Sequence, residues 1–595
     1  MTDQICSQDL NYVRIICKHK YLPDYPSPVK KLMMCLSSVL SVALTNYGRN
    51  LSTEIQKTQH AEQWFHAPGL TVRSTFFSMV VLSRTLITPP ALRPLSLIFL
   101  LVVIWARLAT AALISDALLS CLQSSGISTV TSNSSTFAQD SLAFNRRFEY
   151  TPAAIVFPRS TQDVAIAVKC ASSVNGTIPV SARSGGHSYG AFSLGGQDGT
   201  LVIDLSNLKN ITVNQDYTAN IQTGNRLGDV ALALFANGER ALAHGTCPYV
   251  GIGGHAGCGG FGLASRAWGL VLDQIESAEV VIANGTVLRA SESINSDLFW
   301  ALRGASPSFG IVTEYKVRTQ SAPPSNIVFS YAYSVDPSVA SEILASFQFF
   351  SQYSAPPELG LQLSVIPSRQ PGIITLSLIG IYMGSLTTFN TIIAPLISSV
   401  PVSPRTTNVT QFEWIPSLVR KGGIGTLDTS LRLDASDTFF AKSLMVPHDA
   451  VLTPSAIRAL FDYLAAEGVS TDTKWFVLAD LFGGEGSIIS DIPHNSTAYA
   501  HRKGLYNFQM YASSLDLQPP FPIDGIDFLN NLYNSITSNM PSNWSFGAYP
   551  CYADPTLSDI QWQTQYYGDH YPILQSIHSK YNPSSLFRYP QAVAA

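Results

Sequence analysis

Short apolar runs alternate with segments of helical spacing between residues 153 and 317. Runs rich in Val and Ile between turn residues predict strands, and a period near 3.6 predicts helices. Thr161 can cap the helix that follows it, and Asn284-Gly285 predicts a hairpin turn. The predicted strands are 154–157, 178–180, 200–205, 218–223, both arms of 278–288, and 309–317; helices are predicted at 115–123, 162–173, 227–237 and 297–304, with a polar linker after residue 123.

A Pro- and Ser-rich stretch, 321–325, marks a boundary, and longer alternating strands follow it. We expect an α+β fold of two domains, with 112–320 as the first and 321–545 as a cap over a site. The segment 546–595 is expected to return to the first domain. Strands are predicted at 331–333, 372–383 and 474–482, and helices at 338–352 and 454–466.

The composition is that of a well-packed globular protein. Hydrophobic residues make up 46% of the 595 positions, charged residues only 13%, and the net charge is −4. This balance predicts no nucleic-acid partner, because no basic patch stands out. Low charge with many Ser, Thr, Asn and Gly residues is typical of a secreted surface.

The apolar run 96–105 has the length of a signal-peptide core, preceded by Arg84 and Arg93 and followed by the small-residue site Ala109-Thr110-Ala111. It is too short for a comfortable membrane span. We expect 79–111 to be a signal peptide, with Met79 as the true start and 1–78 as a non-native extension. The alternative is a signal anchor with a cytoplasmic tail. The mature chain is expected to be secreted, outside the membrane and monomeric.

Five cysteines follow the predicted signal peptide, and seven Asn-x-Ser/Thr triplets agree with secretion. An odd number leaves at least one cysteine without an internal disulfide partner. Cys121 with Cys170 is the predicted pair, which leaves Cys247 for another role. The state of Cys258 and Cys551 stays open. The triplets begin at Asn133, Asn175, Asn210, Asn284, Asn408, Asn495 and Asn543.

Two glycine-rich stretches stand out, Arg183-Ser184-Gly185-Gly186-His187-Ser188-Tyr189-Gly190 and 244–255. Each places one nucleophilic side chain, His187 or Cys247, among residues too small to keep a ligand away. Glycine lets the backbone approach a planar or phosphorylated group. The two loops therefore predict one large cofactor held from two sides.

Three simpler motifs fit these loops poorly. The G-x-S-x-G pattern at Gly186 lacks the helix that a hydrolase elbow needs. The G-x-G-x-x-A pattern at Gly251 follows no buried strand, which a dinucleotide fingerprint requires. His187, His244, His255 and Cys247 lack the close-paired spacing of metal ligands, so no metal site is predicted.

The two loops, the segment 297–304 and the ending 580–591 resemble the berberine bridge enzyme-like oxidases. These belong to the wider vanillyl-alcohol oxidase superfamily of PCMH-type flavoproteins. The resemblance covers about residues 115–591 and implies a PCMH-type FAD-binding fold with an α+β substrate domain. The pattern is most similar to fungal glucooligosaccharide and chitooligosaccharide oxidases.

The resemblance implies a bicovalent FAD, joined through His187 to the flavin 8α-methyl and through Cys247 to flavin C6. Imidazole and thiolate are nucleophilic enough for such attachment. Val250 matches the family's gatekeeper position, where a small side chain is associated with oxygen access. The other residues expected at the cofactor are Arg183, Ser184, Gly185, Gly186, Ser188, Tyr189, Gly251, Gly253, Gly254 and His255.

The resemblance also implies that Tyr552 is the catalytic base and that Asp480 assists it. A phenol is a poor base near neutrality, and a neighbouring carboxylate can accept its proton. The C1 hydride of a sugar would pass to FAD, and O2 would be reduced to H2O2. Tyr189, Phe476, Gln509 and Tyr549 are expected to contact the substrate.

Three positions depart from the oligosaccharide oxidase pattern. Phe261 replaces a tyrosine, Phe476 a tryptophan and Leu478 a glutamine. These replacements make the expected pocket more apolar than a sugar site usually is. The leading substrate is a reducing-end oligosaccharide; the alternative is an apolar specialised metabolite that is dehydrogenated or cyclised.

Overall fold

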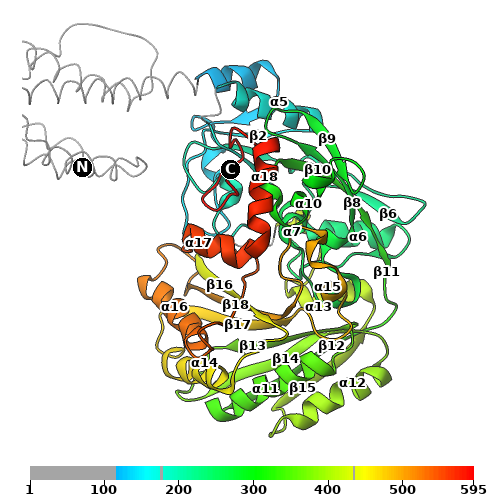
Figure 1. Cartoon of the computed structure of the whole chain (residues 1–595), viewed down its shortest axis with the longest axis vertical. Helices are drawn as coiled ribbons and strands as arrows, with labels where there is room; N and C mark the ends of the chain where they lie inside the picture. Colours follow the sequence, from blue (N-terminus) through cyan, green and yellow to red (C-terminus); the bar gives the residue numbers. More distant parts are fainter. Residues whose placement is uncertain (1–115, 175–177, 433–435, 595) are drawn as a thin grey trace, which may run out of the picture. The chain divides into compact units, whose positions relative to one another are not determined.

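The computed structural model describes residues 116–174, 178–432 and 436–594 (Figure 1). The first sheet has the strand order β1-β2-β4-β3, in which β2 and β3 run parallel to β4. Its strands are β1 (Ser128–Val130), β2 (Ala154–Phe157), β3 (Val180–Arg183) and β4 (Leu201–Asp204). Helix α5 (Thr161–Ser173) buries its apolar side against this sheet.

Two local predictions in this region were wrong. Ser160, not Thr161, caps α5, because its hydroxyl accepts the Asp163 amide hydrogen. Thr161 instead donates to the Glu279 carboxylate at 2.5 Å. The predicted polar linker contains β1, which pairs antiparallel with β2. This edge strand was not predicted because it has only three residues, two of them polar.

The second sheet is antiparallel, with the order β5-β6-β10-β8-β9. The predicted hairpin is present as β8 (Ile275–Val281) and β9 (Val287–Ser291), with Gly285 at a φ of +75° in the turn. Helices α6 and α10 contribute buried apolar side chains to the core that this sheet supports. Its other strands are β5 (Ile211–Val213), β6 (Thr218–Gln222) and β10 (Ile311–Arg318).

The helices between these strands are α4 (Phe137–Asp140), α6 (Leu227–Ala236), α7 (Ile252–Cys258), α8 (Ser265–Trp268), α9 (Val271–Gln274) and α10 (Ser296–Ala305). The backbone of α10 is non-helical at Arg303 and Gly304, close to its predicted end. Short turns η2 (Phe192–Leu194) and η3 (Ser306–Ser308) and the strand pair β7 (Arg240–Ala241) and β11 (Gln320–Ser321) complete this part.

A seven-stranded antiparallel sheet follows, in the order β15-β12-β14-β13-β17-β18-β16. The helices α11, α14 and α16 cover one face and bury a large apolar core (Figure 1). The strands are β12 (Asn326–Val335), β13 (Leu359–Ile366), β14 (Ile374–Met383), β15 (Thr406–Phe412), β16 (Phe439–Pro447), β17 (Thr473–Leu481) and β18 (Gly504–Ser514). The helices are α11 (Pro337–Tyr353), α12 (Leu386–Ser399), α13 (Trp414–Gly422), α14 (Pro454–Glu467), α15 (Ile488–Asp491) and α16 (Ile523–Thr537).

The C-terminal segment packs against the second sheet's core. Aromatic side chains of 562–581 share a buried cluster with α7 and α10, and Leu586 and Phe587 join the core beside α5. Its elements are α17 (Asp559–Trp562), the π-turn η6 (Gln563–Tyr567), η7 (Gly568–His570) and α18 (Tyr571–Tyr581). Turns η4 (Thr429–Leu431) and η5 (His494–Ser496) lie in earlier loops.

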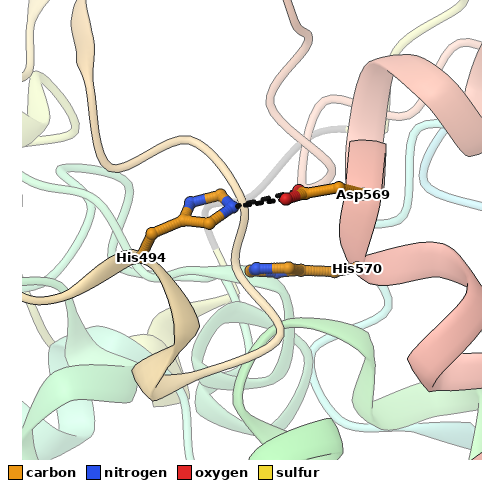
Figure 2. A group of neighbouring side chains, drawn as sticks. All are labelled: His494, Asp569 and His570. Atoms are coloured by element: carbon orange, nitrogen blue, oxygen red, sulfur yellow. Dashed lines mark hydrogen bonds and ion pairs between the residues drawn. The ribbon is translucent and has the colours of Figure 1, made fainter.

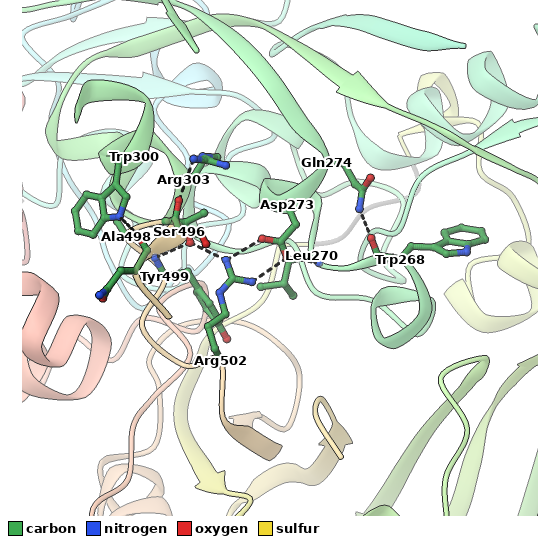
Figure 3. Close-up of polar contacts among 12 residues, drawn as sticks. Trp268, Leu270, Asp273, Gln274, Trp300, Arg303, Ser496, Ala498, Tyr499 and Arg502 are labelled. Carbon is green, nitrogen blue, oxygen red and sulfur yellow. Dashed lines mark hydrogen bonds and ion pairs between the residues drawn. The ribbon is translucent and has the colours of Figure 1, made fainter. Parts of the chain in front are cut away.

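A buried ion pair ties the loop 494–503 to the second sheet's domain (Figure 3). Arg502 is bidentate on Asp273, with bonds of 2.8 and 2.9 Å, and both side chains are almost fully buried. Such a pair orients two segments because each charge is satisfied only in that geometry. The loop is therefore held at a defined position against α9 and α10.

Two disulfides join distant segments. Cys121 is bonded to Cys170, as predicted. Cys258 is bonded to Cys551, a pair 293 residues apart that the sequence left open. Cys247 lies outside both bonds. None of the described helices combines the length and apolar character that crossing a membrane requires. The predicted signal peptide, 79–111, and the extension 1–78 lie outside the described residues.

Candidate active site

A cavity of about 600 Å³ opens between the two glycine loops, the seven-stranded sheet and the segment 549–553. It brings together residues that the sequence separates by more than 350 positions. Of the predicted cofactor residues, all except Arg183 line it: Ser184, Gly185, Gly186, His187, Ser188, Tyr189, Cys247, Val250, Gly251, Gly253, Gly254 and His255. Tyr552 and the predicted substrate contacts Phe476, Gln509 and Tyr549 line it as well.

The glycines serve a purpose that the sequence did not reveal. A Cβ atom added to Gly185 would lie 2.3 Å from the Gly251 nitrogen, and one added to Gly251 would lie 2.0 Å from the Gly185 nitrogen. The two loops therefore pack backbone against backbone. Gly254, in contrast, has nothing within 4 Å of its Cβ position and lines the cavity. Only some of the glycines lie open to a ligand.

The polar residues of the two loops hold the loops to each other. Ser184 Oγ accepts a hydrogen bond from the Gly253 amide at 3.3 Å and donates to the Thr223 carbonyl at 2.5 Å. His255 Nε2 accepts from the Gly245 amide at 3.0 Å, and burial lowers the pKa of His255 to about 3. His255 is therefore a neutral acceptor within the loop.

Arg183, predicted at the cofactor, is not among the residues that line the cavity. Its Nε forms an ion pair with Asp204 on β4, and its Nη1 donates to the Asp140 carbonyl. Arg183 is the last residue of β3, and Asp204 is its partner in the β3–β4 register. The guanidinium thus joins the strand that leads into the first glycine loop to its neighbour.

The two predicted attachment residues both reach the cavity. The His187 ring stacks on Phe144, with centroids 4.0 Å apart and planes inclined by 24°. The sequence did not indicate Phe144 as a site residue, because Phe144 precedes the predicted first strand and belongs to no motif. Its position is set by backbone bonds between residues 144–146 and Asp437. The stack orients one nucleophile toward the space shared with Cys247.

The second wall of the cavity is the open face of the seven-stranded sheet. Along β17, Trp475, Val477 and Ala479 point into the apolar core, so the alternate residues Phe476, Leu478 and Asp480 point the other way. The β17–β18 register pairs Phe476 with Tyr511, Leu478 with Gln509, and Asp480 with Asn507. This alternation carries the predicted substrate residues to the cavity.

Tyr552 stands at the junction of the two walls. Its ring stacks on Tyr189 with centroids 5.5 Å apart and an interplanar angle of 7°, and Gln509 donates to the Tyr189 hydroxyl at 2.6 Å. Burial raises the pKa of Tyr552 well above its usual range, and the Asp480 charge raises it further. The phenol is therefore protonated at neutral pH unless a base takes its proton.

Asp480 is 2% exposed and does not line the cavity. Its carboxylate accepts a hydrogen bond from Gln362 Nε2, its register partner on β13. Lys421 Nζ, from α13, donates to Gln362 Oε1 at 3.4 Å. Burial raises the pKa of Asp480 to about 6, although Gln362 and Lys421 both act to lower it. Burial also lowers the pKa of Lys421 to about 8.

Gln362 and Lys421 were missed because their spacing from Asp480 carries no local signal. Gln362 is one of two polar residues, with Ser364, in an otherwise apolar strand, and Lys421 is the second-last residue of a short helix. A polar position inside β13 is the one clue that the sequence offered. Together they support the carboxylate through hydrogen bonds from Lys421 to Gln362 and from Gln362 to Asp480.

Tyr549 faces the cavity with its ring while its hydroxyl is engaged elsewhere. The phenol oxygen accepts hydrogen bonds from the Gly260 and Phe261 amides, each at 3.0 Å. Cys551, two residues on, is disulfide-bonded to Cys258 at the end of α7. These links fix the segment that carries Tyr552 to the second glycine loop's helix.

Two of the three departures from the oligosaccharide oxidase pattern, Phe261 and Phe476, make aromatic stacks. Phe261 stacks on Phe482 with centroids 3.8 Å apart, and Phe476 stacks on Tyr511 at 4.8 Å. Tyr511 donates to Asp437 at 2.7 Å, and both residues line the cavity. Burial raises the pKa of Asp437. Tyr511 and Asp437 are further cavity residues that the sequence did not reveal.

The cavity fits a large planar cofactor. Two nucleophilic side chains, His187 and Cys247, share its wall, and the Gly254 Cβ position faces open space. Aromatic rings and backbone line much of the remainder, which suits an isoalloxazine ring. The site and the fold together define a flavin-dependent oxidoreductase.

Comparison with known proteins identifies the family. A family model described as "FAD binding domain" matches residues 152–291, and one described as "Berberine and berberine like" matches residues 548–594. The chain belongs to the berberine bridge enzyme-like family of FAD-dependent oxidases, and the predicted fold class is confirmed.

Two curated relatives span most of the chain. The xylooligosaccharide oxidase of Thermothelomyces thermophilus is 34% identical over 482 residues, which cover 80% of this chain and 93% of the relative. An FAD-linked oxidoreductase, dpmaF of Metarhizium anisopliae, is 36% identical over 480 residues, covering 81% and 91%.

Solved structures of oligosaccharide oxidases have the same fold as this chain. A glucooligosaccharide oxidase from Acremonium strictum, described with a 6-S-cysteinyl, 8α-N1-histidyl FAD, has a TM-score of 0.75 at 32% identity. The two chains match over 80% of this one and 99% of the other. A xylooligosaccharide oxidase from Myceliophthora thermophila C1 in complex with xylobiose has a TM-score of 0.74 at 34% identity, covering 80% and 99%.

Proposed function

We propose that this protein is a secreted FAD-dependent oxidase that converts the C1 hydroxyl of a reducing-end oligosaccharide to a lactone. The observation that carries the proposal is the charge of Asp480, a residue buried behind the cavity wall, acting on the phenol of Tyr552, which lines the cavity. Relatives named for oligosaccharide oxidation support the substrate class.

We propose that the FAD is attached twice, through His187 and Cys247. Both side chains reach the same cavity, and a relative of the same fold is described with cysteinyl and histidyl links. The test is flavin fluorescence in a denaturing gel for wild type, His187→Ala, Cys247→Ala and the double variant. We expect either single variant to keep the label and the double variant to lose it; a labelled double variant contradicts the assignment.

The residues of this chain then carry out the proton chemistry. Tyr552 accepts the proton of the substrate C1 hydroxyl, and Asp480 receives the phenol proton in turn. An FAD held by His187 and Cys247 would supply the acceptor for the C1 hydride, with O2 as the final electron acceptor and H2O2 as its product. Tyr189 holds the Tyr552 ring by stacking on it, and Gln509 fixes Tyr189 through its 2.6 Å hydrogen bond to the Tyr189 hydroxyl. Val250, on the cavity wall, is small enough to leave a path for O2.

Asp480 is suited to this step by its environment. Its pKa of about 6 leaves it ionised at neutral pH yet able to hold a proton briefly. Gln362 and Lys421 keep the carboxylate oriented and charged. We therefore assign Gln362 and Lys421 as positioning residues that act through Asp480.

A second substrate class is favoured by the apolar side chains Phe261 and Phe476 on the cavity wall. Phe476, Leu478 and Phe261 stand where the sugar oxidase pattern has polar or larger groups, and the dpmaF relative is 36% identical. The alternative function is dehydrogenation or oxidative cyclisation of an apolar specialised metabolite. The same cofactor and the same base would serve it.

One experiment separates the two. The purified protein is incubated with cello-, malto-, xylo- and chito-oligosaccharides while H2O2 is followed. Turnover of any series supports the oligosaccharide proposal. No H2O2 from any sugar, with the flavin still covalently bound, contradicts it and favours the metabolite alternative.

The secreted, monomeric state also belongs to the proposal, together with the domain bounds 112–320, 321–545 and 546–595. Two disulfides among the described residues support an oxidising compartment. Mass spectrometry of the N-terminus of secreted protein tests the signal peptide; a peptide from 1–78 would contradict cleavage after residue 111.

A further inference from the structure

A second cluster of reactive side chains lies away from the cavity. His494, Asp569 and His570 point toward one another from the turn η5 and from η7, which leads into α18 (Figure 2). One ligand atom from each lies within 4.8 Å of the others. His494 Nε2 is 3.0 Å from Asp569 Oδ1 and 3.3 Å from Oδ2. None of the three lines the cavity.

The environment of His570 leaves a lone pair on its Nε2 atom. His570 is 1% exposed, and its Nδ1 lies 3.2 Å from the Ala498 carbonyl oxygen. A carbonyl only accepts, so Nδ1 carries the hydrogen, and in a neutral ring the lone pair belongs to Nε2. A metal-binding histidine is typically oriented by this kind of bond from its other nitrogen.

The atom that faces His570 Nε2 is itself an acceptor. Asn495 Oδ1 lies 3.4 Å from it, and two acceptors do not satisfy each other. A cation between them would bind both. Asn495 also opens a predicted glycosylation triplet, but a glycan would be attached through Nδ2 and leave Oδ1 available.

The backbone that carries these residues is held in place, as Figure 3 shows for the loop 495–502. Trp300 Nε1 donates to the Asn495 carbonyl at 2.9 Å, and Arg303 Nη2 donates to the Ser496 carbonyl at 3.0 Å. The Trp300 ring also packs edge-on against His570, with centroids 5.2 Å apart. The cluster therefore has a rigid base.

The outer side of the cluster is accessible and adjustable. The His494 side chain is 41% exposed and the Asp569 side chain 74%. Metal–ligand bonds to nitrogen and carboxylate oxygen are about 2.0–2.2 Å. The ligand atoms of the three side chains, which lie within 4.8 Å of one another, must therefore move slightly closer together to bind one ion. Exposed side chains can make that movement, while His570 stays fixed.

We propose that His494, Asp569 and His570 form a binding site for a divalent transition-metal cation of the Zn²⁺ class. Two imidazoles and one carboxylate are the donor set that such ions accept. Asn495 Oδ1 or a solvent molecule completes the coordination. The bound ion joins the 494–496 turn to the start of α18, two segments 75 residues apart in sequence.

Zn²⁺ titration of the chelator-treated full-length holoenzyme by calorimetry tests the site. Wild type is expected to bind one Zn²⁺ tightly. Loss of an outer-shell partner alone costs about 10–100-fold in metal affinity, so His494→Ala and Asp569→Ala should weaken binding at least about tenfold. Both residues are exposed, and flavin absorbance checks that the variants fold. His448→Ala, at a histidine outside the cluster, is the control and should bind like wild type.

Cu²⁺ provides an independent readout. Electron paramagnetic resonance of the Cu²⁺-loaded wild type should show coupling to two imidazole nitrogens, reduced to one in His494→Ala. The proposal is overturned if wild type takes up no Zn²⁺, which leaves the cluster a hydrogen-bonded His–Asp group. It is equally overturned if His494→Ala and Asp569→Ala bind as tightly as the control.

Discussion

The two walls of the cavity are built in different ways. The glycine-loop wall comes from two continuous stretches, 184–189 and 245–255, whose backbones pack on each other at Gly185 and Gly251. The sheet wall comes from single residues of β17 and β18, namely Phe476, Gln509 and Tyr511, which strand register brings into line. The first wall depends on the absence of side chains, and the second on their alternation.

This difference predicts two kinds of failure. A change in the glycine wall should disturb packing and cofactor attachment together, because the same backbone does both. A change in the sheet wall should alter rate, pH dependence or substrate preference while the flavin stays bound, because its outward side chains are not part of the apolar core behind it. Four variants can break or sharpen this distinction.

The largest expected effect is at Tyr552. Tyr552→Phe removes the group that accepts the substrate proton, and general acid–base catalysis of this kind contributes about 10²–10⁴-fold. We expect kcat to fall by that factor with covalent flavin unchanged, measured by H2O2 release and in-gel fluorescence. Tyr566→Phe, at another tyrosine of the cavity wall, is the control. A Tyr552→Phe variant with near wild-type kcat would remove Tyr552 from the mechanism.

The second variant targets the loop contact. Gly185→Ala places a Cβ 2.3 Å from the Gly251 nitrogen, and overpacking of this kind costs about 1–3 kcal/mol. We expect a lower Tm and less covalent flavin. Gly254→Ala has open space at its Cβ position and should lower flavin attachment without lowering the Tm of the protein. Equal thermal unfolding of both variants would argue against backbone packing of the loops.

The third variant concerns pH. Asp480 must be ionised to take the phenol proton, so the rate should fall as pH drops through about 6. Lys421→Met removes a positive charge that lowers this pKa, and the acidic limb of the kcat profile should move to higher pH. Lys503→Met, at an exposed lysine, should leave the profile in place. An unmoved limb in Lys421→Met would show that Lys421 does not act on Asp480.

The smallest effect is expected on substrate preference. Phe476→Trp combined with Leu478→Gln restores the oligosaccharide oxidase pattern on the β17 face. A hydrogen bond to a substrate contributes about 0.5–1.5 kcal/mol, so KM for the preferred sugar should fall a few-fold with little change in kcat. Steady-state kinetics on oligosaccharide series measures it. A higher KM would indicate that the native wall suits an apolar substrate.

Local patterns predicted strands such as 154–157 and helices such as 454–466, because these have strong apolar periods. They did not predict strands β13, β15, β16 and β18 or helices α12, α13 and α16. Thr161 was wrongly predicted to cap α5 because it follows Ser160, another hydroxyl residue that can cap a helix. Only the tertiary structure shows that Thr161 bonds to Glu279 instead. The short strand β1 was missed because its partner β2, not its own composition, makes it a strand.

The sequence by itself determined the two glycine loops with His187 and Cys247, since the residues that make this wall are neighbours along the chain. It also indicated Tyr552 and Asp480, through the family resemblance. Only the tertiary structure decided that Arg183 turns to Asp204, that Gln362 and Lys421 support Asp480, and that Cys258 pairs with Cys551. The cluster of His494, Asp569 and His570 likewise appears only when the chain folds. Contacts of this kind arise from strand register and long-range packing, which leave no local trace in the order of residues.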